Sequence, residues 1–306
     1  MSSRHGALHG GDGSSHAGAG ARHDAQESQD KAPPAAPLLH ADSLAWGLAG
    51  HRLGHGLSLR LAPGDVLAVM GRNGSGKTTL LRSLLGLLPP LAGRIELDGR
   101  PLAAWPRREL AAHIGYVAQH ASAPAGYAVL DWVLLARTAR LPLGRAPSAA
   151  DRQAAQAALH SVGIADRAGL ALDALSGGER QLAAMARALA QGSRLLLLDE
   201  PCASLDFGNR ARVDEVLRRL ADAGHAIVLT THDPAQAAAL AQRVLLIEPG
   251  APAMLGPADE MLEASRLARA FDVPMQALRG LAPTRIGRDA GGSTRSKAPP
   301  PRQHLP

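Results

Sequence analysis

The stretch Met70-Gly-Arg-Asn-Gly-Ser-Gly-Lys-Thr-Thr79 fits the pattern G-x-x-x-x-G-K-[ST] and decides the fold. It follows the apolar run 66–70, which predicts a buried strand, and precedes leucines at helical spacing. In this context the backbone N–H groups turn inward around a phosphate, and the helix N-terminus adds positive potential. The predicted phosphate-binding loop (P-loop) consists of Gly71, Arg72, Asn73, Gly74, Ser75, Gly76, Lys77, Thr78 and Thr79.

Lys77 is the only lysine between Lys31 and Lys297, although arginine is frequent throughout the chain. A compact ammonium can lie between the β- and γ-phosphates of a nucleotide, whereas a bulkier, planar guanidinium does not fit the same closed loop. The Thr78 hydroxyl can ligate Mg²⁺. We therefore expect a nucleoside triphosphate and Mg²⁺ as ligands, which leaves kinases, GTPases, helicases and transport ATPases open.

The composition excludes several classes of protein. The chain of 306 residues contains one cysteine, Cys202, which rules out a disulfide framework and a multi-cysteine zinc site. No run of about 18 apolar residues could span a bilayer, and the N-terminus lacks the apolar core of a secretory signal. The net charge is +6, but five of the basic residues lie in 281–306 and no dense basic run occurs elsewhere. We therefore expect a cytoplasmic protein without a nucleic-acid partner.

The chain divides into a central domain and two tails. Residues 1–37 and 281–306 are rich in Gly, Pro and polar residues, and we expect both to be disordered. Between them, at 38–280, short apolar runs alternate with helical patterns, which predicts an α/β domain with a mostly parallel sheet. Buried strands are expected at 66–70, 195–198, 226–230 and 244–247, antiparallel strands at 57–61 and 94–99, and a surface helix at 151–159.

A second motif lies at Leu175-Ser-Gly-Gly-Glu-Arg-Gln181. Ser176 followed three residues later by Glu179 predicts a capping box that opens a helix. Gly177 and Gly178 in the first turn each weaken that helix by ~1 kcal/mol relative to alanine. Such glycines are tolerable where another group, for example a nucleotide phosphate, approaches the backbone closely.

This stretch resembles the signature sequence of the ATP-binding cassette (ABC) ATPases, and the resemblance extends over residues 38–280. It implies a P-loop NTPase fold with a mostly parallel core sheet, an antiparallel β subdomain and an α-helical subdomain at about 120–192. It also implies ATP hydrolysis, with ATP and Mg²⁺ as the bound cofactors.

Four further stretches resemble motifs of the same family, in the same order. Residues 195–200 resemble the Walker B strand, which implies that Asp199 supports Mg²⁺ and that Glu200 polarises the attacking water. The resemblance further implies the following roles: Gln119 contacts Mg²⁺ and links to a membrane partner, Asp206 lies in the D-loop that crosses to a partner subunit, and His232 senses the γ-phosphate.

The resemblance also implies a head-to-tail dimer, either a homodimer or a pair of ATPase subunits. Ser176, Gly177 and Gly178 of one subunit would close over ATP held by the P-loop of the other. The family stacks adenine on an upstream aromatic residue, and Trp46 is the only aromatic residue before the P-loop. Trp46 is therefore the predicted adenine-stacking residue, with a buried core tryptophan as the alternative. Cys202 stands where threonine is usual and is interpreted as a packing variant.

As a transporter ATPase, the chain is expected to be peripheral on the cytoplasmic side of the inner membrane. Its partners would be transmembrane permease subunits, facing residues 119–145, and indirectly a periplasmic or extracellular substrate-binding protein. Residues 129–137, 204–209 and 255–257 resemble the importer ATPases for iron–siderophore, haem and cobalamin. Import of a metal chelate is therefore the predicted function; a free-metal (Mn or Zn) importer and an exporter are the alternatives.

Overall fold

The computed structural model describes residues 37–119, 126–142 and 144–278. The predicted disordered tails, 1–37 and 281–306, lie outside the described residues except for residue 37. The same is true of two predicted boundaries, the start of the helical subdomain at residue 120 and the end of the domain at residue 280. All elements discussed below belong to one compact unit of the chain.

The core of the domain is a sheet whose strands run in the order β10-β9-β3-β8-β7-β6 within the described residues. The pairs β9–β3, β3–β8, β8–β7 and β7–β6 are parallel, and β10 is antiparallel to β9. Every residue of β3, β7 and β8 is buried, as expected of parallel strands covered on both faces. The strands are β3 (Val66–Met70), β6 (Ile114–Val117), β7 (Leu195–Leu198), β8 (Ala226–Thr230), β9 (Arg243–Leu246) and β10 (Met254–Pro257).

A second, antiparallel sheet has the order β2-β1-β4-β5, with β1 (Leu39–Leu48), β2 (His51–Leu61), β4 (Ala92–Leu97) and β5 (Arg100–Pro101). Its strands alternate between the core and solvent: Leu57, Leu59 and Leu61 are buried, whereas the residues between them are exposed. This confirms both predicted antiparallel strands, but β2 begins six residues before the predicted 57–61, and β4 lies two residues before the predicted 94–99. The β1–β2 pairing carries register shifts around Trp46, which lies opposite Gly54.

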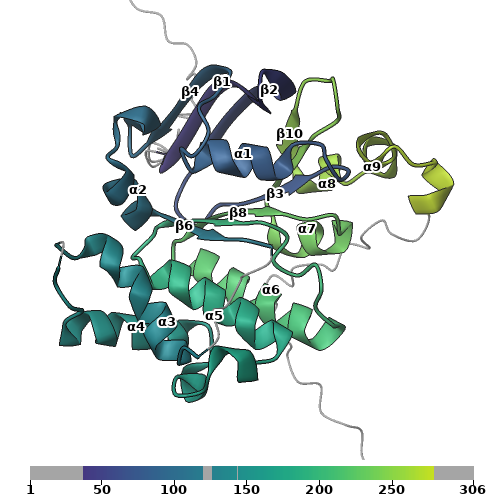
Figure 1. Ribbon diagram of the computed structural model, residues 1–306. Coiled ribbons are helices and arrows are strands. Elements are labelled where there is room, and N and C mark those ends of the chain that lie inside the picture. The colour runs from purple at the N-terminus through teal and green to yellow at the C-terminus, as the bar shows by residue number, and fades with distance from the viewer. Residues whose placement is uncertain (1–36, 120–125, 143, 279–306) are drawn as a thin grey trace, which may run out of the picture. The chain divides into compact units, whose positions relative to one another are not determined.

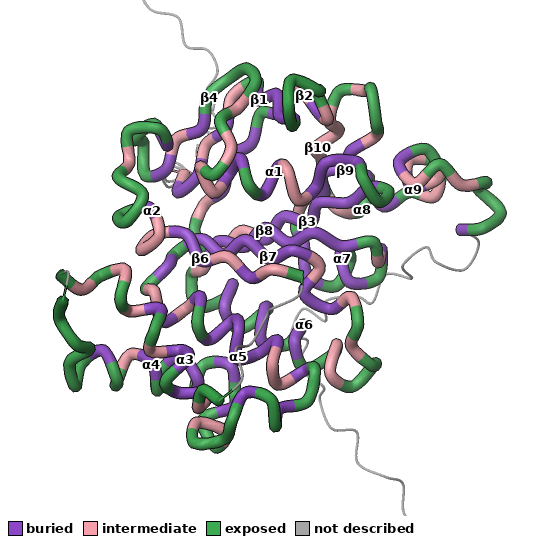
Figure 2. Tube along the Cα trace, in the orientation of Figure 1, coloured by how far each residue is buried: buried purple, intermediate pink, exposed green. Residues whose placement is uncertain are grey.

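Helices cover both faces of the core sheet (Figure 1). On one face, α1 (Lys77–Leu84) buries its leucines against Leu67 and Val69 of β3 and against the antiparallel sheet. On the other face, Ala68 and Met70 of the same strand pack against the helical layer that contains α5 (Gly177–Ala190) and α6 (Phe207–Asp222). This alternation explains why the core strands form the buried layer in Figure 2. The remaining α-helices of the described residues are α2 (Arg107–His113), α3 (Val129–Leu134), α4 (Ala149–Ser161), α7 (Pro234–Leu240), α8 (Ala258–Met261) and α9 (Ala264–Phe271).

Helices α3, α4 and α5 pack together in the position expected for a helical subdomain. The predicted surface helix at 151–159 is part of α4, but its first predicted residue is not at the surface. Asp151 is buried, and its carboxylate is stabilised there by a capping box with Ser148 and by a hydrogen bond from Arg137 Nε at 2.9 Å. The Ser148 bonds and Arg137 lower the pKa of Asp151 to about 2. In the part of the chain that the structure describes, no helix is long and apolar enough to cross a membrane.

The sheet topology brings four loops together. The loops that follow β3, β6, β7 and β8 all leave the carboxyl ends of neighbouring parallel strands, so they meet at one edge of the sheet. These loops carry the P-loop, Gln119, Asp199 with Glu200, and His232, respectively. The fold therefore assembles most of the predicted site residues from distant parts of the sequence.

Candidate functional site

The P-loop joins β3 to α1 and depends on glycine at two crowded positions. Gly71 has φ +152°, and a Cβ there would lie 2.5 Å from the carbonyl oxygen of Ile247. Gly76 has φ +98°, and a Cβ there would lie 2.8 Å from Cβ of Leu53. At both positions a residue with a side chain would have a strained backbone, and its Cβ would overlap a neighbouring atom. The Ser75 hydroxyl within the loop is buried and has no hydrogen-bond partner among the described residues.

Lys77, the first residue of α1, is buried beneath this loop. Its Nζ donates to the carbonyl oxygens of Gly71 at 2.9 Å and Arg72 at 3.2 Å, and it lies 3.8 Å from Oε1 of Glu200. Burial lowers the pKa of Lys77, while Glu200 and Asp199 oppose that shift by stabilising its charge. The ammonium is thus held at the P-loop, facing two carboxylates.

Asp199 and Glu200 follow β7 and are fixed by a chain of hydrogen bonds. The Thr78 hydroxyl donates to Asp199 Oδ2 at 2.7 Å, and the Thr230 hydroxyl donates to Asp199 Oδ1 at 2.7 Å. The same Thr230 oxygen accepts a hydrogen bond from the Glu200 backbone N–H at 2.8 Å. Thr230 therefore connects the end of β8 to both acidic residues of the neighbouring strand.

Side chains from three other loops converge on the Glu200 carboxylate. Besides Lys77, Gln119 Nε2 donates to Oε2 of Glu200 at 3.2 Å, and Nδ1 of His232 lies 3.5 Å from the same oxygen. Glu200 itself has φ +46°, a left-handed conformation that is uncommon for residues with a side chain and tends to occur at functional sites. Its side chain is only 14% exposed. This site therefore presents one oriented carboxylate beside a phosphate-binding loop.

The predicted signature residues lie elsewhere, at the start of α5. Ser176 is the N-cap: its hydroxyl accepts from the Glu179 N–H, and Glu179 Oε2 accepts from the Ser176 N–H at 2.9 Å, which confirms the capping box. The Ser176 N–H and then Arg167 lower the pKa of Glu179 to about 2. Within the described residues, no hydrogen bond or ion pair joins 176–178 to 71–79.

Comparisons with known proteins agree with this geometry. Residues 55–203 match the family described as "ABC transporter". The hemin import ATP-binding protein HmuV of Streptomyces coelicolor is 40% identical over 248 residues, which cover 80% of this chain and 88% of that protein. The chain belongs to the ATP-binding subunits of ABC transporters.

Two further proteins are similar to this ABC ATPase, and their names give different cargo. The molybdate import ATP-binding protein MolC of Haemophilus influenzae is 37% identical over 220 residues, covering 72% of this chain and 81% of that protein. A solved inward-facing structure of a metal-chelate type ABC transporter aligns with a TM-score of 0.70 and 34% identity, covering 78% of this chain and 90% of that one. Membership of the family means that the chain binds and hydrolyses ATP.

The oxygen atoms around Asp199 fit the Mg²⁺ predicted for this ABC ATPase. The Thr78 hydroxyl and the Asp199 carboxylate already share a hydrogen bond, and Mg²⁺ is usually bound by one or two protein oxygens together with phosphate oxygens and water. Among the described residues, no cluster of three or more His, Cys, Asp and Glu could hold a metal alone. Gln119 turns its amide nitrogen to Glu200, and its contact with Mg²⁺ stays a prediction.

Trp46 lies next to the P-loop but is fully buried, so its ring has no exposed face for adenine in this structure. A Cβ at Gly54 would lie 2.1 Å from the Trp46 ring, which shows how closely the facing strand packs against it. The indole N–H donates to the Gly76 carbonyl oxygen at 3.1 Å. The buried alternative therefore describes Trp46 in this structure, and its contact is with the P-loop backbone.

Two other predicted site residues, Asp206 and Gly178, lie next to Asn209 at the start of α6. Asp206 is the N-cap of α6, and its carboxylate accepts from the Asn209 N–H at 2.8 Å, which is the main reason that its pKa is lowered. A Cβ on Gly178 would lie 2.4 Å from Oδ1 of Asn209, whereas one on Gly177 would meet only Leu205 at 3.8 Å. Gly178 thus admits the start of α6, whereas a Cβ at Gly177 meets no close neighbour; the contact of both glycines with a nucleotide stays a prediction.

Thr230 is the site residue that the sequence analysis missed. Its signal is a hydroxyl at the carboxyl end of an otherwise apolar strand, but many buried threonines share that pattern. Only the sheet order, which sets β8 beside β7, places Thr230 against Asp199 and Glu200.

Proposed function

We propose that this chain is the ATP-hydrolysing subunit of an importer that carries a metal chelate: an iron–siderophore, haem or cobalamin. The convergence of Lys77, Gln119 and His232 on the Glu200 carboxylate carries the assignment of hydrolysis. Haem import by HmuV and the metal-chelate type of the similar solved transporter support the cargo class. The similarity to a molybdate importer indicates that the ATPase fold itself does not select the cargo.

In the proposed mechanism, Glu200 orients and polarises the water that attacks the γ-phosphate. Its carboxylate can accept the water's proton, and Lys77 and His232, which lie beside it, can hold it in place. His232 can also contact the phosphate. Lys77 and the P-loop N–H groups bind the β- and γ-phosphates. Thr78 and Asp199 would hold Mg²⁺, which supplies positive charge to the phosphates when it is bound.

We further propose that two such chains form a head-to-tail dimer with ATP at each interface. Among the described residues, no hydrogen bond or ion pair joins 176–178 to the P-loop of the same chain. This supports the arrangement, because Gly177, where a Cβ would have no close neighbour, can then face the nucleotide of a second chain. Phe207, directly after Asp206, is 88% exposed, the highest value among the large hydrophobic side chains of the described residues. An aromatic side chain so exposed is typical of a surface that a partner covers.

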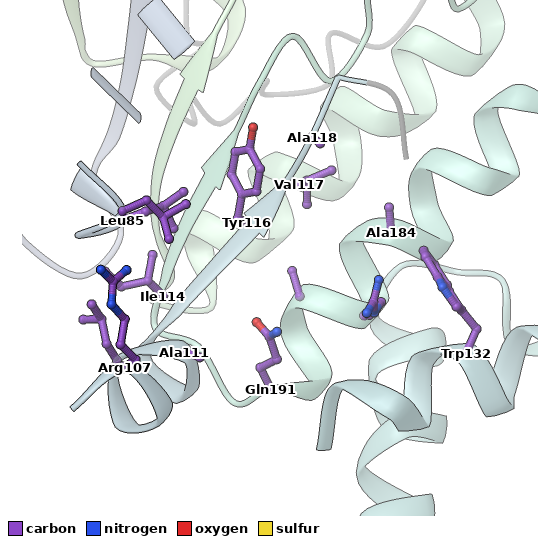
Figure 3. A pocket seen from close by; sticks show the side chains of 14 residues that line it. Leu85, Arg107, Ala111, Ile114, Tyr116, Val117, Ala118, Trp132, Ala184 and Gln191 are labelled. Atoms are coloured by element: carbon purple, nitrogen blue, oxygen red, sulfur yellow. The ribbon is translucent and has the colours of Figure 1, made fainter. Parts of the chain in front are cut away.

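The membrane subunits are proposed to bind a groove between α2, β6, α3 and α5 (Figure 3), on the cytoplasmic side of the membrane. The groove has a volume of about 510 Å³ and an apolar lining that includes Leu85, Ile114 and Trp132. Ala118 also lines it and precedes Gln119, which donates to Glu200. A partner seated in the groove can therefore influence the position of Gln119 at the hydrolysis site.

Two arginines that line this groove, Arg107 and Arg187, favour a partner that supplies an acidic side chain. The Arg187 guanidinium carbon lies 4.8 Å from the centre of the Trp132 ring, and burial lowers its pKa. Neither Arg187 nor Arg107, which also lines the groove, has an ion pair among the described residues. Both side chains are exposed in the chain alone, and cations at such a surface are stabilised when a partner supplies a carboxylate.

Binding to the membrane subunits can be tested by charge reversal. We expect Arg187→Glu to weaken retention of the chain by its membrane subunits at least about tenfold, measured by co-purification from the native membrane at several salt concentrations. Its intrinsic ATP hydrolysis should be unchanged. Arg219→Glu makes the same charge change on α6, away from the groove, and should have no effect. Equal retention of the two variants would refute the groove as the docking site.

The cargo is tested by uptake in the native cell, comparing wild type with a chromosomal Glu200→Gln substitution. Labelled ferric siderophore, haem, cobalamin, Mn²⁺, Zn²⁺ and molybdate are offered in parallel. Selective loss of one chelate is the expected result. Loss of free-metal or molybdate uptake alone would contradict the chelate proposal, and unchanged uptake of every compound would contradict import.

A further inference from the structure

A buried polar cluster lies behind the hydrolysis site and takes no part in the mechanism described so far. It consists of Cys202, Asp214 and Gln236, which are 3%, 8% and 4% exposed. Asp214 Oδ1 accepts a hydrogen bond from Gln236 Nε2 at 2.7 Å and lies 3.7 Å from the Cys202 sulfur. Burying a carboxyl group costs folding free energy, which its hydrogen bonds offset only in part, so the presence of Asp214 here suggests a role beyond packing.

The donors in this cluster are well defined. Burial, and then the nearby Asp214, raise the pKa of Cys202 to about 12, so the sulfur is a thiol and donates its proton. Burial also raises the pKa of Asp214, against the opposing effect of the Gln236 hydrogen bond. A thiol of this kind is a weak nucleophile, which agrees with the interpretation of Cys202 as a packing residue rather than a reactive one.

Each of the three residues belongs to a different segment of the site. Cys202 lies two residues after Glu200, Gln236 lies four residues after His232, and Asp214 belongs to α6, the helix that Asp206 caps. The cluster therefore joins the loop of the proposed base, the D-loop helix, and the helix that follows the γ-phosphate sensor.

A second contact joins the same two helices. Arg210 and Asp214 are four residues apart and lie on one face of α6, while Asp233 and Gln236 are three residues apart at the start of α7. Arg210 forms an ion pair with Asp233, one turn away from the Asp214–Gln236 hydrogen bond. Two parallel contacts fix the rotation of one helix against the other, which a single contact would not.

We propose that Asp214 is a positioning residue that fixes His232 relative to the Glu200 carboxylate, through Gln236 on one side and Cys202 on the other. His232 needs such support because its own side chain is 54% exposed and its contact with Glu200, at 3.5 Å, is long. This inference rests on the roles proposed for Glu200 and His232. It adds that α6, which begins at the D-loop, contacts the segments that carry Glu200 and His232.

The test exchanges the two side chains of the buried pair. Gln236→Glu places a second carboxyl group against Asp214, and we expect it to lower kcat for ATP at least about tenfold, because small displacements of reacting groups have large effects on rate. Asp214→Asn combined with Gln236→Glu restores one amide and one carboxylate, and should return kcat to within about threefold of wild type. Cys202→Ala is the mild variant, removing one donor with little volume, and should lower kcat severalfold.

Two readouts separate positioning from simple loss of stability. The dissociation constant for ATP should stay within about twofold in every variant, because the P-loop contacts do not involve this cluster. The control, Ser193→Ala, removes another buried hydrogen bond, from the Ser193 hydroxyl to the Ala188 carbonyl oxygen at 2.8 Å. It should lower the melting temperature without lowering kcat.

Glu200→Gln and His232→Ala are measured in the same series. If they abolish turnover but Gln236→Glu and Cys202→Ala leave kcat at the wild-type value, Asp214 has no positioning role and only this inference fails. The same conclusion follows if the exchange variant rescues melting temperature but not kcat. If Glu200→Gln and His232→Ala themselves retain normal turnover, the proposed mechanism fails.

Discussion

Replacement of Thr230 by valine should uncouple the two acidic residues of the hydrolysis site. The hydroxyl is fully buried, donates to Asp199 at 2.7 Å and accepts from the Glu200 N–H at 2.8 Å. Valine keeps the shape and the preference for a strand but removes both bonds. A hydrogen bond to a charged group contributes about 1.5–3 kcal/mol, and an unsatisfied buried N–H costs about 1–3 kcal/mol. Because both losses share one atom, we expect about 3 kcal/mol of lost folding free energy rather than the full sum.

Two measurements on purified full-length variants check this prediction. Unfolding in urea gives the change in folding free energy, and steady-state ATP hydrolysis gives kcat, which should fall at least about tenfold because Glu200 loses its backbone anchor. Thr230→Ser is the control: it keeps the hydroxyl and removes one methyl group, which costs about 1 kcal/mol. If the valine and serine variants have equal stability and equal kcat, the hydrogen-bond chain through Thr230 does not hold the site.

Three other predictions concern single residues of the P-loop and the signature sequence. Lys77→Ala and Lys77→Arg should both abolish tight ATP binding, measured by equilibrium titration, and tight binding by the arginine variant would contradict the argument from the size of the ammonium. Because the pKa of Glu179 is lowered from its ordinary 4.5 to about 2, its stabilising effect is complete above pH 4.5 and is lost as the pH falls through 2. The stability difference between wild type and Glu179→Gln, from urea unfolding, should therefore shrink over that window; a constant difference would refute the assignment. Gly178→Ala should destabilise the fold by about 1–3 kcal/mol because its methyl group would overlap Asn209, whereas Gly177→Ala should not; equal melting temperatures would show that α6 does not pack against Gly178.

Features that depend on a few neighbouring residues could be predicted from the sequence. The buried strand at 66–70, the P-loop before α1 and the capping box of Ser176 with Glu179 depend on a few neighbouring residues, and the structure confirms each. The predicted strand at 244–247 was displaced by one residue, since β9 runs from Arg243 to Leu246. Strand ends are set by pairing with β3, which the local pattern does not contain.

Features that depend on contacts between distant segments could not be predicted. The sequence left Trp46 open between adenine stacking and a buried position, because its burial depends on the register that places it opposite Gly54. One reason for glycine at Gly178 is Asn209, a residue of another helix that the local pattern does not contain. Likewise, Asp214 looks like an ordinary surface residue of a polar helix until α7 covers it.

The central claim, that Glu200 is the group required for hydrolysis in a dimer that encloses ATP, is tested most directly by one variant. Full-length Glu200→Gln is incubated with Mg²⁺ and ATP, and turnover and molecular mass in solution are measured on the same sample. The claim predicts that ATP stays bound, turnover falls to background and the mass doubles, because the dimer closes but cannot hydrolyse. Normal turnover in this variant, or a monomer that holds ATP without turnover, would contradict it.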